Sequence, residues 1–148
     1  MSAHERSGWR CEKISARHRL WGYNCPAVDL DFVVAEYNHE KPVALIEYKD
    51  KQAQSPDVRH PTYGALKCLA NGFNEGALPF FIATYCSDDW WFRLTPMNEA
   101  AEKFYSSLRK DEAITEKRFV KSLYVMRKHI LTINDLRLIE GLNAVLPQ

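Results

Sequence analysis

The sequence predicts an α+β fold, with a set of strands accompanied by several helices. Residues 28–37 and 42–49 are strand-like and flank a short polar turn, as in a β-hairpin. A helical segment at 60–72 and two further strand-like segments, at 78–85 and 90–96, follow that hairpin. Helices and strands that occur in one chain of this length favour the α+β class.

Composition sets the broad class of the protein. The 148 residues are enough for one domain with a sizeable core, and 46% hydrophobic with 26% charged residues is typical of globular chains. The sequence has no run of about 18 apolar residues, and its polar first ten residues do not resemble a signal peptide. Cys11, Cys25, Cys68 and Cys86 form no CxxC pair, which disfavours a cysteine metal site. We therefore expect a reduced, cytoplasmic protein with no membrane partner.

Helical periodicity and residues that begin or end helices predict the remaining elements. The helical spacing of Trp9, Lys13, Ala16 and Leu20 predicts a first helix over residues 4–20. Pro61 at the first position and Gly72 at the end bound the helix after the hairpin. The segment "LPFFIATY" predicts a strand buried on both faces. Later helices are predicted over residues 96–108, 115–130 and 133–145.

The helix over residues 115–130 is strongly amphipathic. Its apolar stripe is expected to pack on the core and its lysine stripe to face outward. The apolar stripe consists of Phe119, Leu123, Met126 and Ile130, and the lysine stripe of Lys117, Lys121 and Lys128.

Positive charge is concentrated at the two ends of the chain. Residues 1–28 hold five basic and two acidic side chains, and residues 115–130 hold five basic and one acidic, whereas the whole chain carries only +1. Basic ends around an acidic centre suit a polyanion held near a metal ion. Solvated helix faces explain the same charges, so charge alone leaves both interpretations open.

The hairpin carries charged residues where its strands end. Asp29 and Asp31 share one face of their strand, and Glu47 and Lys49 share one face of theirs, because side chains alternate along a strand. If the hairpin is centred near His39, then 31 lies opposite 47 and 29 opposite 49, and all four groups converge. A slip of one residue would send the two pairs to opposite faces.

Convergence of these groups predicts a cation site. Three carboxylates beside one lysine repel one another unless a cation lies between them, and oxygen ligands favour Mg²⁺ or Mn²⁺. Lys49 would then orient a metal-bound water or stabilise negative charge in the transition state. The alternative is an exposed hairpin with cross-strand Asp–Lys pairs, which contribute little to stability. The apolar run "PVALI" before Glu47 favours the site.

The order of elements resembles the PD-(D/E)XK nuclease superfamily, with "PAVDLD" and "EYK" as the motif residues. The segments "RHRLWGYNCPAVDLDFV" and "KPVALIEYK" are similar to segments of small stand-alone nuclease-like proteins of phages and prophages. Residues 28–71 carry most of the match. The resemblance implies a single domain over residues 1–148. A restriction-endonuclease-like αβββαβ core with a mixed sheet would cover about 4–96, and extra C-terminal helices about 97–148.

The resemblance also implies a metal-dependent phosphodiesterase acting on DNA, sometimes RNA, and, for a phage protein, action in the host cytoplasm. The implied metal ligands are Asp31 or Asp29, Glu47 and the carbonyl of Tyr48; Lys49 is the implied catalytic lysine, and Glu12 or Glu5 an accessory acid. Three features depart from the family pattern. Pro26 does not adjoin Asp29, the gap from Asp31 to Glu47 is long, and "RLWGY" would have to supply the leading strand.

Other residues are candidates for contacting nucleic acid. They are Lys51 and Gln52 after the hairpin, Tyr63 and Lys67 on the following helix, and Arg17, His18 and Arg19 on the first helix. Solvated side chains or helix caps are the alternative for each of them, and His60 is expected to be a loop or cap residue. Of Trp90 and Trp91, one is expected in the core and the other is a candidate for stacking on a base.

The function expected from the sequence is that of a Mg²⁺- or Mn²⁺-dependent nuclease, with DNA as the first substrate. An inactive nuclease-fold interaction module of phage origin is the main alternative. A third interpretation is a homodimeric structural protein that associates through the strand at 78–85 or through the C-terminal helices.

Overall fold

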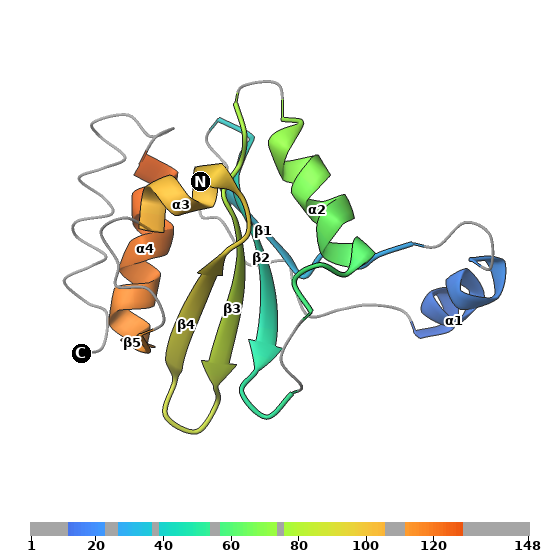
Figure 1. The fold of residues 1–148 in the computed structure, drawn as a ribbon, viewed down its shortest axis with the longest axis horizontal. Helices are drawn as coiled ribbons and strands as arrows, with labels where there is room; N and C mark the ends of the chain where they lie inside the picture. The colour runs from blue at the N-terminus through green and yellow to red at the C-terminus, as the bar shows by residue number, and fades with distance from the viewer. Residues whose placement is uncertain are drawn as a thin grey trace.

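The computed structural model describes residues 12–22, 27–36, 39–53, 57–73, 76–105 and 112–128. These residues form a mixed sheet with helices on both sides, which confirms the predicted α+β class (Figure 1). The elements are α1 (Glu12–Trp21), β1 (Phe32–Glu36), β2 (Lys41–Asp50), α2 (Pro61–Asn71), β3 (Phe80–Cys86), β4 (Trp91–Pro96), α3 (Glu99–Tyr105), β5 (Ile114–Thr115) and α4 (Glu116–Lys128).

The five strands lie in the order β1-β2-β3-β4-β5. β2 and β3 are parallel and are connected through α2, whereas every other neighbouring pair is antiparallel. β3 is the central strand, and Phe80, Phe81, Ile82 and Ala83 are each 0% exposed, which confirms the prediction of a strand buried on both faces. Its backbone is paired on both sides. The expectation that this strand could form a dimer interface is therefore wrong.

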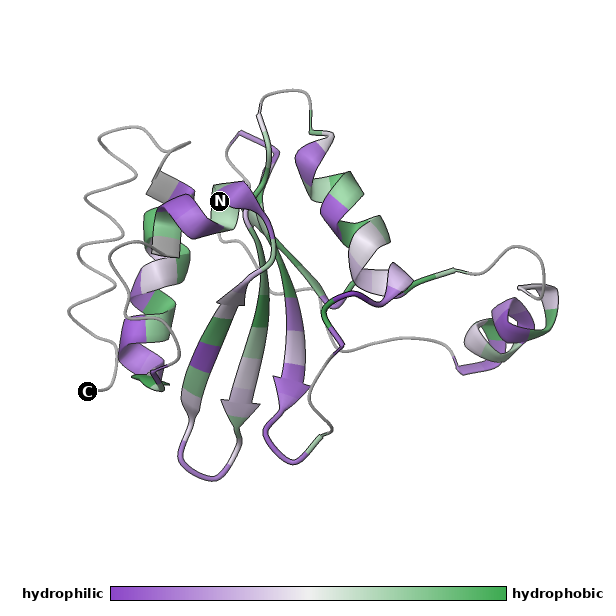
Figure 2. Cartoon of the chain, in the orientation of Figure 1, coloured by the Kyte–Doolittle hydropathy of each residue, from purple (hydrophilic) through white to green (hydrophobic). Residues whose placement is uncertain are grey.

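Two clusters of apolar side chains hold the helices against the sheet. On one face, Leu45, Phe80 and Ile82 pack against residues of α2. On the other face, Ala44, Ile46, Phe81, Ala83, Phe92 and Leu94 pack with Ala101 of α3 and with Phe119 and Met126 of α4. Figure 2 shows the corresponding hydrophobic stretches along the strands, and also a hydrophilic end of β2 at its arrowhead. The two faces of β2 therefore belong to different cores.

α2 begins and ends where the sequence predicts. Pro61 is the first helical residue, and the side chain of His60 accepts a hydrogen bond from the backbone N–H of Thr62 at 3.2 Å. His60 is therefore the N-cap, as expected. Tyr63, Leu66 and Ala70 form the buried stripe of the helix.

Asn98 joins three elements through its buried side chain. Its Oδ1 accepts hydrogen bonds from the backbone amides of Phe80 at 3.1 Å and Ala101 at 2.9 Å. Its Nδ2 donates to Oδ1 of Asn71 at 3.0 Å and to the carbonyl of Leu78 at 2.7 Å. The amide is thus fully satisfied, and it fixes the end of α2, the start of β3 and the first turn of α3.

α4 confirms the predicted amphipathic spacing. Phe119 and Met126 are buried, and Leu123 packs against the same cluster, whereas Lys121 is exposed and Lys117 is partly exposed. The side chain of Lys128 lies outside the described part of the protein. Ile130 and the helix predicted over residues 133–145 lie outside the described residues. None of the helices in the described ranges is long and apolar enough to cross a bilayer.

The N-terminal part departs from the implied αβββαβ order. α1 stands apart from the sheet, and none of its residues is buried (Figure 1). "RLW" is helical at Arg19–Trp21 and does not supply a strand. Within the described ranges, two strands precede α2 where the resemblance implies three. The short β5 was not predicted.

Candidate active site

The pairing of β1 with β2 determines where the acidic residues lie. Phe32 pairs with Ile46, so Asp31 and Glu47 come next to one another just beyond that pair. A bulge between Val34 and Ala35 shifts the register nearer the turn. The predicted register therefore holds on the side of the bulge that carries the acidic pair, and Asp31 and Glu47 meet as expected.

Asp31 and Glu47 are linked by two backbone hydrogen bonds. The N–H of Asp31 donates to Oε1 of Glu47 at 2.9 Å, and the N–H of Tyr48 donates to Oδ2 of Asp31 at 2.9 Å. Each carboxylate is thus oriented by the main chain that carries the other. Among the described residues, the second oxygen of each carboxylate accepts no such bond.

Burial and charge both act on Glu47. Its side chain lies on the α2 face, two residues after Leu45, and is only 6% exposed. Burial is the main cause that raises the pKa of Glu47 above its usual value, and the neighbouring carboxyl group of Asp31 raises it further. The amide of Asp31 and the charge of Lys49 act in the opposite direction. Two close carboxyl groups, one of them buried, are an arrangement that a cation would stabilise.

Lys49 lies on the same face as Glu47, two residues further along β2. It is half-buried, and it is close enough to favour the charged form of Glu47. In the part of the chain that the structure describes, Lys49 forms no ion pair with an acidic side chain. Its ammonium group is therefore available to an anion near the acidic pair.

Asp29 does not join this pair. It precedes β1 and lines a hollow of about 590 Å³ together with Ser15, His18 and Arg19 of α1. No group of three acidic, histidine or cysteine side chains able to hold a metal occurs among the residues described. The predicted three-carboxylate cluster is therefore not found, and two carboxylates beside one lysine remain.

The other implied ligands are differently placed. Glu12 is exposed on α1, which stands apart from the sheet, and Glu5 lies outside the described residues. The ring of Tyr48 points to the opposite face, where it contacts Phe32 and Phe119 at centroid distances of 5.1 and 6.3 Å. Only its carbonyl remains a candidate ligand.

The predicted nucleic-acid contacts are scattered. Lys67 is exposed on α2, but Tyr63 is a core residue and offers no ring to a ligand. Arg17, His18 and Arg19 are exposed on α1, where the ring of His18 meets that of Trp21 at 5.3 Å. Three of these residues are therefore on a helix that stands apart from the sheet (Figure 1).

Lys51 and Gln52, just after β2, interact with residues close to them in the structure. The thiol of Cys86 lies close to the ammonium group of Lys51 and raises the pKa of Lys51, as do the nearby charges of Asp88 and Asp89. Backbone hydrogen bonds from Asp89 and Asp88, together with Lys51, lower the pKa of Cys86. Gln52 is exposed, and its backbone N–H donates to Asp50 Oδ1 at 2.9 Å.

The tryptophan pair differs from expectation, because neither residue lies in the core. Trp90 occupies the turn before β4 with φ of 50° and is 48% exposed, and its ring stacks on Tyr85 at 6.3 Å. Trp91 is partly exposed on β4, and the guanidinium of Arg93 lies over its ring. Sequence reasoning did not single out Arg93. Alternation along "WWFRLTP" would have placed it on the same face as Trp91.

Comparisons with known proteins found no match to this chain. No protein-family model matches the chain, and no curated protein or solved structure was found to be similar to it.

Proposed function

We propose that this protein is a Mg²⁺- or Mn²⁺-dependent phosphodiester hydrolase that acts on nucleic acid, with DNA as the first substrate to test. The supporting observation is the direct contact of Asp31 with Glu47, beside Lys49 on one face of β2. The resemblance of "PAVDLD" and "EYK" to PD-(D/E)XK motifs implies roles for the same three residues.

The acidic pair fits a hard divalent cation. Mg²⁺ in phosphoryl-transfer sites is commonly bound through one or two carboxylates, with waters and substrate phosphate completing its octahedron. The oxygens of Asp31 and Glu47 that accept no backbone hydrogen bond are the proposed ligands, with the Tyr48 carbonyl as a further candidate. A bound cation would relieve the repulsion between the two carboxylates and lower the pKa of Glu47. Such an ion supplies an activated water and neutralises charge on the phosphate.

The protein's own residues would orient the substrate. Lys49 would hold a phosphate oxygen and stabilise the negative charge that develops on it. The backbone amides of Asp31 and Tyr48 hold the two carboxylates in fixed orientations, so little rearrangement is needed when substrate arrives. Asp29, Glu12 and Tyr63 are left without an assigned role in this scheme.

The experiment is an incubation of the protein with single-stranded, duplex and branched DNA and with RNA, in Mn²⁺ or Mg²⁺. We expect cleavage that EDTA abolishes and that Lys49→Ala reduces by about 100-fold or more. Lys121→Ala, on the exposed side of α4, is the matched control and should cleave normally. The proposal fails if the unmodified protein leaves every substrate intact.

A nuclease-fold interaction module is the second candidate. It is favoured by the absence of a third acidic ligand within the described ranges, and by the backbone hydrogen bonds that already occupy one oxygen of each carboxylate. In that case Asp31 and Glu47 lock β1 to β2 and hold no ion. Melting temperatures that do not change with Mn²⁺, together with intact substrates, would favour this module.

A further inference from the structure

A row of polar side chains crosses three strands on the α2 face of the sheet. Lys49 of β2 pairs with Thr84 of β3, and Thr84 pairs with Arg93 of β4. Directly paired residues point to the same face. Ile82, two residues before Thr84, packs against α2, which identifies the face. Lys49, Thr84 and Arg93 therefore form one continuous row across about 10 Å, two inter-strand spacings.

α2 does not cover this row. In the neighbouring row, Glu47 and Ile82 are buried, at 6% and 0% exposed. One row further on, Lys49 and Thr84 are partly exposed and Arg93 is exposed. Figure 1 shows α2 along the upper part of the sheet, ending well before the arrowheads of β2 and β3. The open part of this face thus begins directly beside the acidic pair.

Trp91 holds Arg93 in place. The guanidinium carbon of Arg93 lies 5.5 Å from the ring centroid of Trp91, a cation–π contact that leaves the N–H groups free to bind an anion. Arg93 forms no ion pair with any acidic residue that the structure describes, unlike Arg59, whose Nε is 3.8 Å from Asp57. An exposed arginine held by an aromatic ring and lacking an acidic partner is suited to phosphate.

We infer that Lys49, Thr84 and Arg93 form a phosphate-binding surface along which one nucleic-acid strand reaches the acidic pair, with Trp91 as the positioning residue for Arg93. This inference rests on the proposed function and extends it to how substrate is held. Asp88 and Asp89 mark the limit of the surface beyond Trp91, because their charges repel a polyanion. The strand would therefore cross the sheet along the row.

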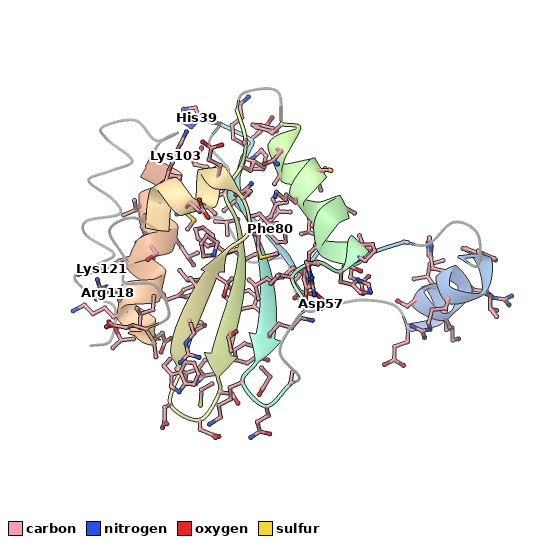
Figure 3. All side chains as sticks on the ribbon, in the orientation of Figure 1. His39, Asp57, Phe80, Lys103, Arg118 and Lys121 are labelled. Carbon is pink, nitrogen blue, oxygen red and sulfur yellow. The ribbon has the colours of Figure 1, made fainter. Side chains whose placement is uncertain are left out.

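The test is DNA binding in EDTA, so that binding is measured without cleavage. Fluorescence anisotropy of a short labelled single strand and of its duplex is followed over a range of salt concentrations. We expect Arg93→Gln to weaken binding about tenfold and to reduce the salt slope by about 0.7 for the single strand and 0.9 for the duplex. Lys121→Gln is the control, since Lys121 is exposed on α4, the helix that packs on the other face of the sheet (Figure 3).

Variants of Trp91 test its positioning role. Trp91→Leu should weaken binding and flatten the salt slope in part, and Trp91→Phe should restore both, because phenylalanine keeps an aromatic face beneath the guanidinium. A merely structural role would change the melting temperature without changing the salt slope.

The outcomes separate this inference from the proposed function. If Arg93→Gln binds with the same affinity and slope as the unmodified protein, the surface is refuted, even when cleavage is observed. If binding depends on Arg93 but no substrate is ever cut, the surface stands and the hydrolase proposal fails. If the unmodified protein binds no nucleic acid, both are refuted.

Discussion

The N–H of Asp31 donates to the carboxylate of Glu47, and the N–H that follows Glu47, on Tyr48, donates back to the carboxylate of Asp31. This reciprocal arrangement holds two acidic groups together just before β1 begins, beyond the first β1–β2 pair, Phe32 with Ile46. The nearby carboxyl group of Asp31 helps to raise the pKa of Glu47, and this proximity leads to the first two predictions.

Glu47→Gln should stabilise the protein at neutral pH when no metal is bound. Because the folded-state pKa of Glu47 is raised, its contribution to stability is fully present below the unfolded value of 4.5 and is lost as the pH rises through the folded pKa. Glutamine stays neutral at every pH, so the variant does not lose this stability as the pH rises. Melting in EDTA from pH 4 to pH 8 should show the variant a few degrees more stable at pH 7 and equal near pH 4. Equal stability at every pH would contradict the raised pKa.

Mn²⁺ should stabilise the protein more at pH 8 than at pH 5, because bound metal needs both carboxylates ionised. At 100 times the dissociation constant the gain is about 2.7 kcal/mol. Asp31→Asn should remove most of it, while Asp57→Asn, in the loop before α2, should not. A shift that persists in Asp31→Asn would place the ion elsewhere on the protein.

Asn98→Ala should destabilise the fold by about 2–4 kcal/mol in urea denaturation. The substitution leaves the buried amide of Phe80 and the carbonyl of Leu78 without their partner and removes the N-cap of α3. Asn71→Ala removes one of the four hydrogen bonds and should lose about 1 kcal/mol. Equal losses for the two variants would contradict the central role of Asn98.

Phe119→Ala should destabilise the protein by about 3–5 kcal/mol. The ring of Phe119 is 4% exposed and stacks on that of Phe92 at 4.1 Å with an interplanar angle of 8°. α4 thus completes the core on one face of the sheet, although the resemblance implies that the helices after residue 97 are additions. Val125→Ala, at a 47% exposed position on the same helix, is the control and should lose under about 1 kcal/mol. Similar losses would mean that α4 is not part of the cooperative core.

The parts of the fold that depend on local sequence were predictable. Pro61 and Gly72 bound α2, the apolar run of β3 indicated a central strand, and alternation brought Asp31 to Glu47. The position of Asp29 was not predictable, because the β1–β2 ladder begins at Phe32 and strand pairing does not fix a residue three positions before it. The bulge after Val34 was also not predictable, since it changes the register without a glycine to mark it.

Relationships between distant strands could not be predicted. The neighbours of Lys49 on β3 and β4 depend on the register of a parallel crossover, which local patterns do not encode. The position of α1 likewise depends on its contacts with the rest of the chain, and the helix's own sequence does not reveal those contacts. For this reason the basic residues of α1 were grouped with a site from which the structure separates them.

The bulge between Val34 and Ala35 separates the hairpin tip from the acidic pair. Pairs on the tip side are offset by one residue from those beside Asp31, so the two halves of the ladder are aligned independently. Insertions or deletions at the tip can then be absorbed before they disturb the end that carries Asp31 and Glu47. The tip is accordingly the place where related chains would be free to vary in length.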